Sequence, residues 1–290
     1  MPLPPLEEQQ RIVARIEELF SLCDTIDQAG AELGGAVTLA RQKVLDMAIR
    51  GQLVPQNPAD EPASELLKRI RAEKAVLAKA GKRKPDRHES TITRGGDNRY
   101  YENVNGKATD ITDQIPFEIP PSWEWVRLPE IAESELGKTL DSARDTGIIK
   151  PYLCSINVLW NKIELQTVKQ ARFDKSEIDK YRLRDGDLLI CEGGIIGRCA
   201  VWHDNSKEMY YQNALHRVRF CGQFKAEFFQ YVLESFGYTG YLLSVSKGMT
   251  IKHLTQTSLF SLLFPLPPLT EQTRIVDAVS TYENLLKGLL

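Results

Sequence analysis

The sequence lacks the features of a secreted, membrane-spanning or zinc-binding protein. Its five cysteines form no C-x-x-C pair, and scattered thiols in odd number are typical of core residues in a reducing compartment (Cys23, Cys154, Cys191, Cys199, Cys221). No stretch approaches the ~20 apolar residues that cross a bilayer. The first residues have neither the basic start nor the apolar run of a signal peptide. We therefore expect a cytoplasmic protein that does not associate with membranes.

The sequence also lacks an excess of charge of one sign and any complete catalytic motif. Its 37 basic and 39 acidic residues give a formal charge of −2, which excludes a bulk polycation but allows a local basic surface. No G-x-S-x-G or H-E-x-x-H motif is present, and the four histidines are too dispersed for a metal site (His88, His203, His216, His253). We predict no catalytic residues, no metal and no cofactor.

Two partial nucleotide-binding motifs occur. Gly137-Lys138-Thr139 resembles the end of a P-loop, but Ala132 stands where the motif requires glycine. The segment 192–197 has only part of a dinucleotide fingerprint, without an acidic residue at the required distance. A nucleotide-binding enzyme that uses 137–139 is therefore a minor alternative.

An internal repeat links the two ends of the sequence. Residues 2–13 read PLPPLEEQQRIV and residues 265–276 read PLPPLTEQTRIV, so ten of twelve positions are identical at an offset of 263. Proline favours an extended residue before it and is tolerated in the first turn of a helix. Each copy is therefore expected to begin a helix after an extended segment.

Apolar residues continue after each copy at alternating spacings of four and three, which is the pattern of a coiled-coil helix. In the first copy this pattern extends from about Leu6 to Arg50, or roughly 65–70 Å. We expect the interface to contain the following apolar residues of this seam: Ile12, Ile16, Leu19, Ile26, Leu33, Val37, Val44, Ile275, Val279 and Leu286.

The intervening sequence divides into three parts. Residues 1–56 form the first long helix, and 57–115 contain a short basic helix over 63–80 and a polar, Gly- and Asn-rich linker over 86–114. Residues 116–264 alternate short strand-like runs, such as 187–191, with turns and contain one clear helix, 225–236. Residues 265–290 begin a second long helix. The fold class is α+β, a domain with one mixed sheet flanked by coiled-coil helices.

Several loops of 116–264 carry side chains that read base edges or bind phosphates. We single out these residues as candidate DNA contacts: Lys138, Thr139, Arg144, Arg198, Gln212, Asn213, His216, Lys247, Thr250, Lys252 and His253. The glycines of 193–197 would let the backbone approach a phosphate closely.

Taken together, these segments resemble the specificity subunits of type I restriction-modification systems. The resemblance is carried by the proline-helix motif at 2–13 and 265–276, by PFEIPPSWEWVRLPEIA at 116–132, and by 192–202, 212–218 and 247–254. It covers nearly the whole chain apart from 86–114. Family members carry two recognition domains, whereas this sequence has one, so it is expected to be a half-subunit, a truncated product or an excised fragment.

The resemblance implies a non-catalytic subunit whose recognition domain reads one half of a bipartite site in double-stranded DNA. It also implies that the long helices set the distance to the other half-site and dock modification subunits, through which the restriction subunit is bound. A homodimer through the long helices would supply the second recognition domain. The main alternative is a coiled-coil scaffold or toxin-antitoxin-like interaction module without DNA reading.

Overall fold

The computed structural model describes residues 4–81, 90–141, 146–204, 206–246 and 253–289. It consists of two compact units, a helical unit (Met1–Val44 and Ser280–Leu290) and a globular unit (Leu45–Val279). The helices are α1 (Leu6–Ile49), α2 (Ala63–Lys79), α3 (Leu128–Ile131), α4 (Lys175–Tyr181), α5 (Ala226–Tyr238), α6 (Tyr241–Val245), α7 (Gln256–Ser261) and α8 (Leu269–Lys287), with 3-10 turns at Thr112–Gln114 and Ser155–Asn157.

The strands are short. They are β1 (Ser90–Arg94), β2 (Tyr100–Val104), β3 (Lys107–Asp110), β4 (Glu124–Arg127), β5 (Ala132–Leu136), β6 (Ile148–Leu153), β7 (Val158–Leu159), β8 (Lys162–Ile163), β9 (Lys169–Phe173), β10 (Asp187–Cys191), β11 (Cys199–Trp202), β12 (Tyr210–Tyr211), β13 (Leu215–Phe220) and β14 (Leu263–Leu266). The predicted α+β class is confirmed.

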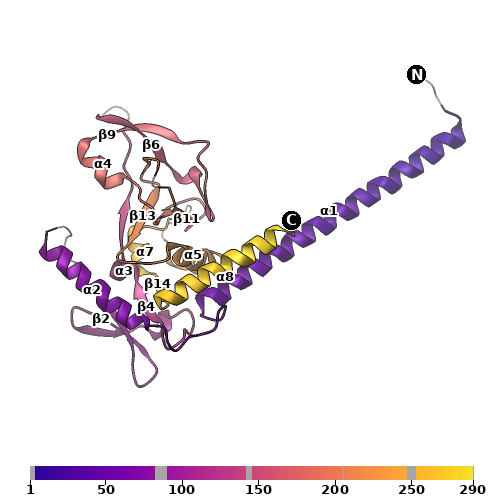
Figure 1. Ribbon diagram of the computed structural model, residues 1–290. Coiled ribbons are helices and arrows are strands. Elements are labelled where there is room, and N and C mark those ends of the chain that lie inside the picture. The colour runs from indigo at the N-terminus through magenta and orange to yellow at the C-terminus, as the bar shows by residue number, and fades with distance from the viewer. Residues whose placement is uncertain (1–3, 82–89, 142–145, 205, 247–252, 290) are drawn as a thin grey trace. The chain divides into compact units, whose positions relative to one another are not determined.

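The helical unit contains most of α1 and the end of α8, which lie side by side and antiparallel (Figure 1). An ion pair of 2.7 Å joins Arg41 to Glu283 across the two helices. Near this pair the apolar seam is partly covered, at Val37 and Val44, whereas Ile16 and Leu19 are 45% and 46% exposed. The N-terminal part of the seam therefore presents apolar side chains to solvent in the isolated chain.

The globular unit is built on a four-stranded antiparallel sheet in the order β11-β10-β13-β5. The central strand β10 is buried at every residue, as its apolar run predicts. The helix α5 contacts β10 and β11. Its side chains Phe229 and Phe236 are buried in the core and pack against Phe264. Strand β10 and helix α5 thus form the rigid centre of the unit.

The expectation of a single sheet was wrong. A second sheet, β12-β6-β9, pairs β6 with β9 antiparallel and with β12 parallel. Its aromatic cluster contains Tyr152, Phe173 and Tyr210, and α4 follows β9 directly. Strands this short bury little surface on their own, so the unit divides its core among several small sheets.

The predicted linker over 86–114 was also wrong where the structure describes it. Strands β1, β2 and β3 form an antiparallel sheet, and Asn105-Gly106, both at positive φ, form the two-residue turn between β2 and β3. Tyr100 and Ile111 are buried in a cluster with Trp125 of β4. Apolar side chains of this segment thus complete the core of the globular unit.

Candidate nucleic-acid interface

Four loops from separate stretches of the chain meet at one end of the four-stranded sheet. Strands β10 and β13 meet there at Cys191 and Leu215, and β5 ends there at Leu136, opposite His216. Backbone hydrogen bonds then join the loops to each other: Asn213 N donates to Lys138 O (3.0 Å), Glu192 N to Ala214 O (3.1 Å) and Leu254 N to Glu192 O (2.8 Å). We call residues 137–139, 192–198, 212–214 and 253–254 the loop cluster.

Glycines permit the close approach of these loops. A Cβ on Gly137 would lie 2.3 Å from the carbonyl oxygen of Gln212. Gly194 and Gly197 both have positive φ, which other residues rarely adopt. A Cβ on Gly193 would lie 3.3 Å from the His253 ring. The glycines of 193–197 therefore serve the packing and turning of the loop itself.

The cluster presents hydrogen-bonding side chains at its surface. Thr139 and His253 are exposed, and Gln212 and Asn213 are half-buried. The Asn213 amide donates to the Thr139 hydroxyl across two loops at 3.3 Å. Beside them the apolar side chain of Ile195 is 56% exposed, a feature that the search for polar side chains did not select.

Two of the predicted DNA contacts are corrected by the structure. Lys138 is 4% exposed, and its ammonium group donates to both carboxylate oxygens of Glu177 at 2.8 and 2.7 Å. His216 is 1% exposed, and its Nε2 lies 3.0 Å from the carbonyl oxygen of Leu254. Both side chains fix the loops from inside, so neither faces a ligand.

The same contacts contradict a P-loop at 137–139. A P-loop lysine must reach the phosphates, whereas the Lys138 ammonium group is buried against a carboxylate. The chain at Thr139–Asp141 is not helical, although a P-loop leads into a helix.

Arg198 is neither buried like Lys138 and His216 nor exposed like Thr139. It is half-buried, and one terminal guanidinium nitrogen donates to the carbonyl oxygen of Ser155 at 2.6 Å. This bond connects the 192–198 loop to the turn after β6. Four further predicted contacts, at Arg144, Lys247, Thr250 and Lys252, lie outside the described residues.

The buried histidine gives the cluster a pH dependence. Burial lowers the pKa of His216 from its ordinary value of 6.5, against the opposing effect of its bond to Leu254. As the pH falls, His216 is therefore protonated at a higher pH in the unfolded chain than in the folded chain. The free energy of unfolding falls as the pH drops through the unfolded pKa.

We expect the variant His216→Gln, whose amide can donate to Leu254 but does not titrate, to lose less stability than the wild type between about pH 7.5 and 5.5. Denaturant unfolding at both pH values measures this difference. His203→Gln, at an exposed position, is the control. If the wild type and H216Q lost the same stability over this pH range, His216 would not be the source of the pH dependence.

The seam residues fall into three groups by exposure. Ile12, Ile16, Leu19, Ile26 and Leu33 are between 43% and 61% exposed, and Val37, Val44 and Leu286 are half-buried. Ile275 and Val279, by contrast, are completely buried. The same apolar pattern thus lies in three different environments.

Neither a metal site nor a membrane span is evident where the structure describes the chain. No group of three or more His, Cys, Asp or Glu side chains there is arranged to hold a metal ion. None of the described helices combines the length and apolar character needed to cross a bilayer.

Comparisons with known proteins agree with these features. A family model described as the type I restriction modification DNA specificity domain matches residues 120–290. The EcoAI and EcoEI specificity subunits of Escherichia coli are 28% and 24% identical to the chain, covering 96% and 97% of it but 52% and 53% of the relatives. The crystal structure of an HsdS subunit from Thermoanaerobacter tengcongensis shares the fold with a TM-score of 0.50 and 21% identity, over 100% of the chain and 54% of that protein.

The chain thus spans about half the length of the curated relatives that it matches. These relatives are named as specificity subunits, in agreement with the prediction of a non-catalytic protein. Because the family model covers more than half of the residues, the chain belongs to the family of type I restriction-modification DNA specificity proteins.

Proposed function

We propose that this chain reads one half of a bipartite DNA target through the loop cluster. The observation that supports this most strongly is the convergence of four loops on one end of a rigid sheet, where Thr139, Gln212, Asn213 and His253 reach the surface. Amide and hydroxyl groups on a rigid support suit hydrogen bonding to base edges in the major groove. The match to about half the length of the relatives suits one half-site.

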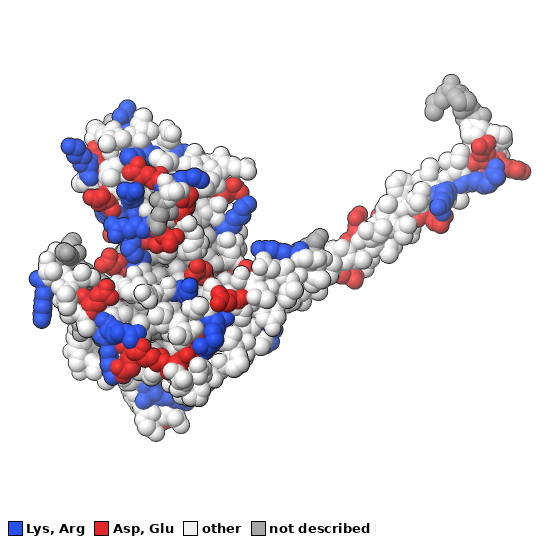
Figure 2. Space-filling model, viewed as in Figure 1, with Lys and Arg blue, Asp and Glu red and all other residues white. Residues whose placement is uncertain are grey.

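The charge distribution supports specific reading over indiscriminate binding. Acidic and basic side chains are intermixed on the face of the globular unit that Figure 2 shows, and the formal charge of the chain is −2. Phosphate neutralisation by basic residues supplies most non-specific affinity. We therefore expect the chain to bind DNA weakly alone and to act in the cytoplasm within a complex, where modification subunits dock on it and connect it to the restriction subunit.

The test is to express the chain with a cognate modification subunit and to map methylated adenines in the host DNA. The expected result is a stable complex and a new methylated motif with an interruption of fixed length. A stable complex without a new motif would contradict half-site reading by this chain. Failure to form any complex would contradict docking and favour the scaffold alternative.

We further propose that two chains pair through the exposed part of the seam of α1, which would bring two recognition domains together. Eight apolar side chains between Leu6 and Ile26 are more than 40% exposed, which is unusual for a solvated helix (Leu6, Ile12, Val13, Ile16, Leu19, Phe20, Leu22 and Ile26). An antiparallel pairing would bury them.

The double variant Ile16→Asp/Leu19→Asp is expected to dissociate this dimer. Burying unpaired carboxylates in the seam costs several kcal/mol per dimer, so the association constant should fall by more than roughly 1000-fold. Sedimentation at micromolar concentration measures it. The control reverses a neighbouring exposed ion pair, Arg15→Glu/Glu18→Arg, and should sediment like the wild type. A wild-type chain that sediments only as monomer would contradict the pairing.

A further inference from the structure

One loop of the cluster carries an apolar side chain that faces solvent. Ile195 is 56% exposed, whereas the next residue, Ile196, is 9% exposed. The two adjacent isoleucines therefore have different roles, because Ile196 packs beneath the 192–198 loop and Ile195 extends from it. Hydrogen bonding to base edges, which suits the polar side chains of the loop cluster, does not account for Ile195.

The backbone that carries Ile195 is closely held. Cys191 N donates to the carbonyl oxygen of Arg198 at 2.8 Å, which closes the loop, and Arg198 N donates to the carbonyl oxygen of Ile195 at 3.2 Å. Gly197, at φ 73°, makes the turn between these residues. Isoleucine is also branched at Cβ and therefore stiff about χ1. Ile195 thus loses little conformational freedom when it contacts another molecule.

Two neighbouring segments support the loop from outside. The Arg198 guanidinium donates to the carbonyl oxygen of Ser155 in the turn after β6, at 2.6 Å. Helix α6 packs directly on the turn, since a Cβ added to Gly197 would lie 2.3 Å from Cδ1 of Leu242. The position of Ile195 is therefore fixed by the fold of the globular unit and not by the loop alone.

Ile195 belongs to the same surface as the polar side chains of the loop cluster. Three residues before it, Glu192 N donates to the carbonyl oxygen of Ala214, the residue after Asn213. The ring of the exposed His253 lies against the same loop. A ligand held by these polar side chains therefore lies within reach of one fixed apolar side chain.

DNA offers one apolar group to such a side chain in the major groove. Every base edge there presents hydrogen-bond donors or acceptors, and thymine alone adds a methyl group, at C5. Contact between two apolar groups removes the surface of both from water. Cytosine, the other pyrimidine, has no methyl group at C5 and carries an amino group where thymine has O4.

We propose that Ile195 reads a thymine of the half-site through its C5 methyl group. The inference rests on the proposed DNA reading by the loop cluster, and it adds the identity of one base to that function. Ile195 is thus a specificity-determining residue that acts by apolar contact, beside the polar side chains that act by hydrogen bonding.

The test measures methylation rates of the full chain in complex with its modification subunit. The substrates are duplexes that carry the mapped motif, with one thymine at a time replaced by uracil. Uracil keeps the hydrogen-bonding groups of thymine and lacks only the methyl group. We expect the replacement of one thymine in the half-site to slow methylation roughly fourfold, which corresponds to the loss of one buried methyl-sized group. Replacement of the other thymines should leave the rate unchanged.

The variant Ile195→Ala links this effect to the side chain. Its complex should methylate the thymine duplex at least roughly fourfold more slowly than the wild type, and uracil at the sensitive position should slow it no further, because the contact is already lost. Val76→Ala, at a 65% exposed position of α2, is the control and should keep both the rate and the sensitivity to uracil.

Several results would overturn the proposal. Equal wild-type rates on all uracil duplexes would remove methyl reading, even if I195A were slow, and would favour insertion of Ile195 between base pairs or contact with the modification subunit. An I195A complex that keeps the uracil effect would assign the methyl contact to another residue. An intact complex that methylates none of the duplexes would overturn the proposed DNA reading and this inference with it, so the two failures are distinct.

Discussion

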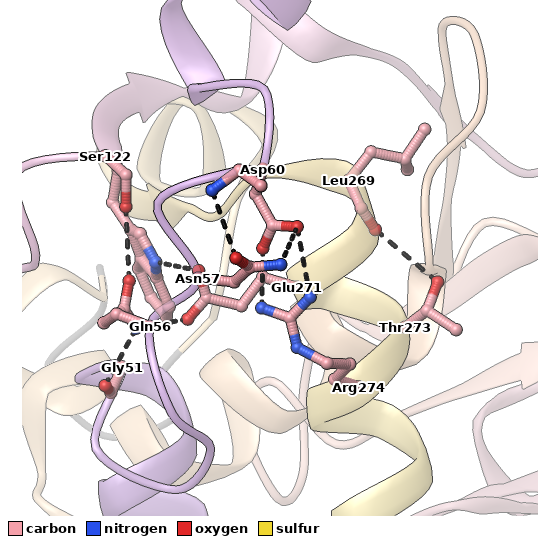
Figure 3. Close-up of polar contacts among 11 residues, drawn as sticks. Gly51, Gln56, Asn57, Asp60, Ser122, Leu269, Glu271, Thr273 and Arg274 are labelled. Carbon is pink, nitrogen blue, oxygen red and sulfur yellow. Dashed lines mark hydrogen bonds and ion pairs between the residues drawn. The ribbon is translucent and has the colours of Figure 1, made fainter.

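Replacing Glu271 with alanine is expected to lower the free energy of unfolding by about 2 kcal/mol, because the buried indole N–H of Trp123 loses its acceptor. The Gln56 amide also donates to this carboxylate (Figure 3), but Gln56 is exposed and its amide donates to the carbonyl oxygen of Gly51 as well (3.1 Å), so it keeps a partner in the variant. The variant also removes a negative charge from the first turn of α8, where it interacts favourably with the helix dipole.

The repeat provides a matched control at the equivalent residue. Glu8→Ala makes the same chemical change in the same sequence context, but Glu8 is exposed, so the free energy of unfolding should change by less than about 0.5 kcal/mol. Urea unfolding, followed by Trp fluorescence, measures both variants. If Glu8→Ala and Glu271→Ala lowered the free energy of unfolding equally, the hydrogen bonds to the Glu271 carboxylate would contribute nothing beyond helix propensity.

The sequence was sufficient to predict elements whose signal is local and repeated. The heptad pattern predicted a helix over about 6–50, and α1 covers Leu6–Ile49. The apolar run Asp187–Cys191 was predicted as a strand with the same bounds as β10. Such patterns are reliable because their signal is local: apolar residues at helical spacing lie on one face of a helix, and a strand covered on both sides is apolar at consecutive positions.

The prediction of a linker over 86–114 was wrong because it relied on polar composition and did not use the turn signal in this segment. Asn105-Gly106 between Tyr100–Val104 and Lys107–Asp110 is a strong local signal for a two-residue hairpin. The surrounding Asn and Gly residues led to the interpretation of a linker instead. Burial of Tyr100 against Trp125 depends on a contact 25 residues away, which no local pattern shows.

The candidate site shows a similar limit. The four loops were identified from the sequence, but the roles of their side chains depend on distant partners. Glu177, 39 residues from Lys138, converts a candidate phosphate contact into a buried ion pair. The carbonyl oxygen of Leu254, 38 residues from His216, likewise holds the histidine inside the loops. Residue type indicated the correct loops, and only the fold distinguished side chains that face solvent from those that hold the loops together.

Asn213→Ala is expected to reduce methylation of the cognate motif by roughly 10- to 100-fold, because loss of one amide contact to a base costs about 1–3 kcal/mol. The loop that carries Asn213 is fixed by its backbone bond to Lys138. Among the described residues, its side chain makes one hydrogen bond, of 3.3 Å, to the exposed Thr139, so the amide can make two bonds to an adenine edge. The extent of methylation at each genomic copy of the motif, with the modification subunit present, measures the effect.

The pattern of residual methylation separates the two ways in which Asn213 can contact DNA. If it reads a base, one position of the half-site becomes degenerate while the others are retained. If it binds a phosphate, methylation falls by a similar factor at every site and the motif is unchanged. Asn284→Ala, at an exposed position of α8, is the control and should leave both the extent and the motif unchanged. Wild-type methylation by N213A in an intact complex would remove the loop cluster from the DNA interface.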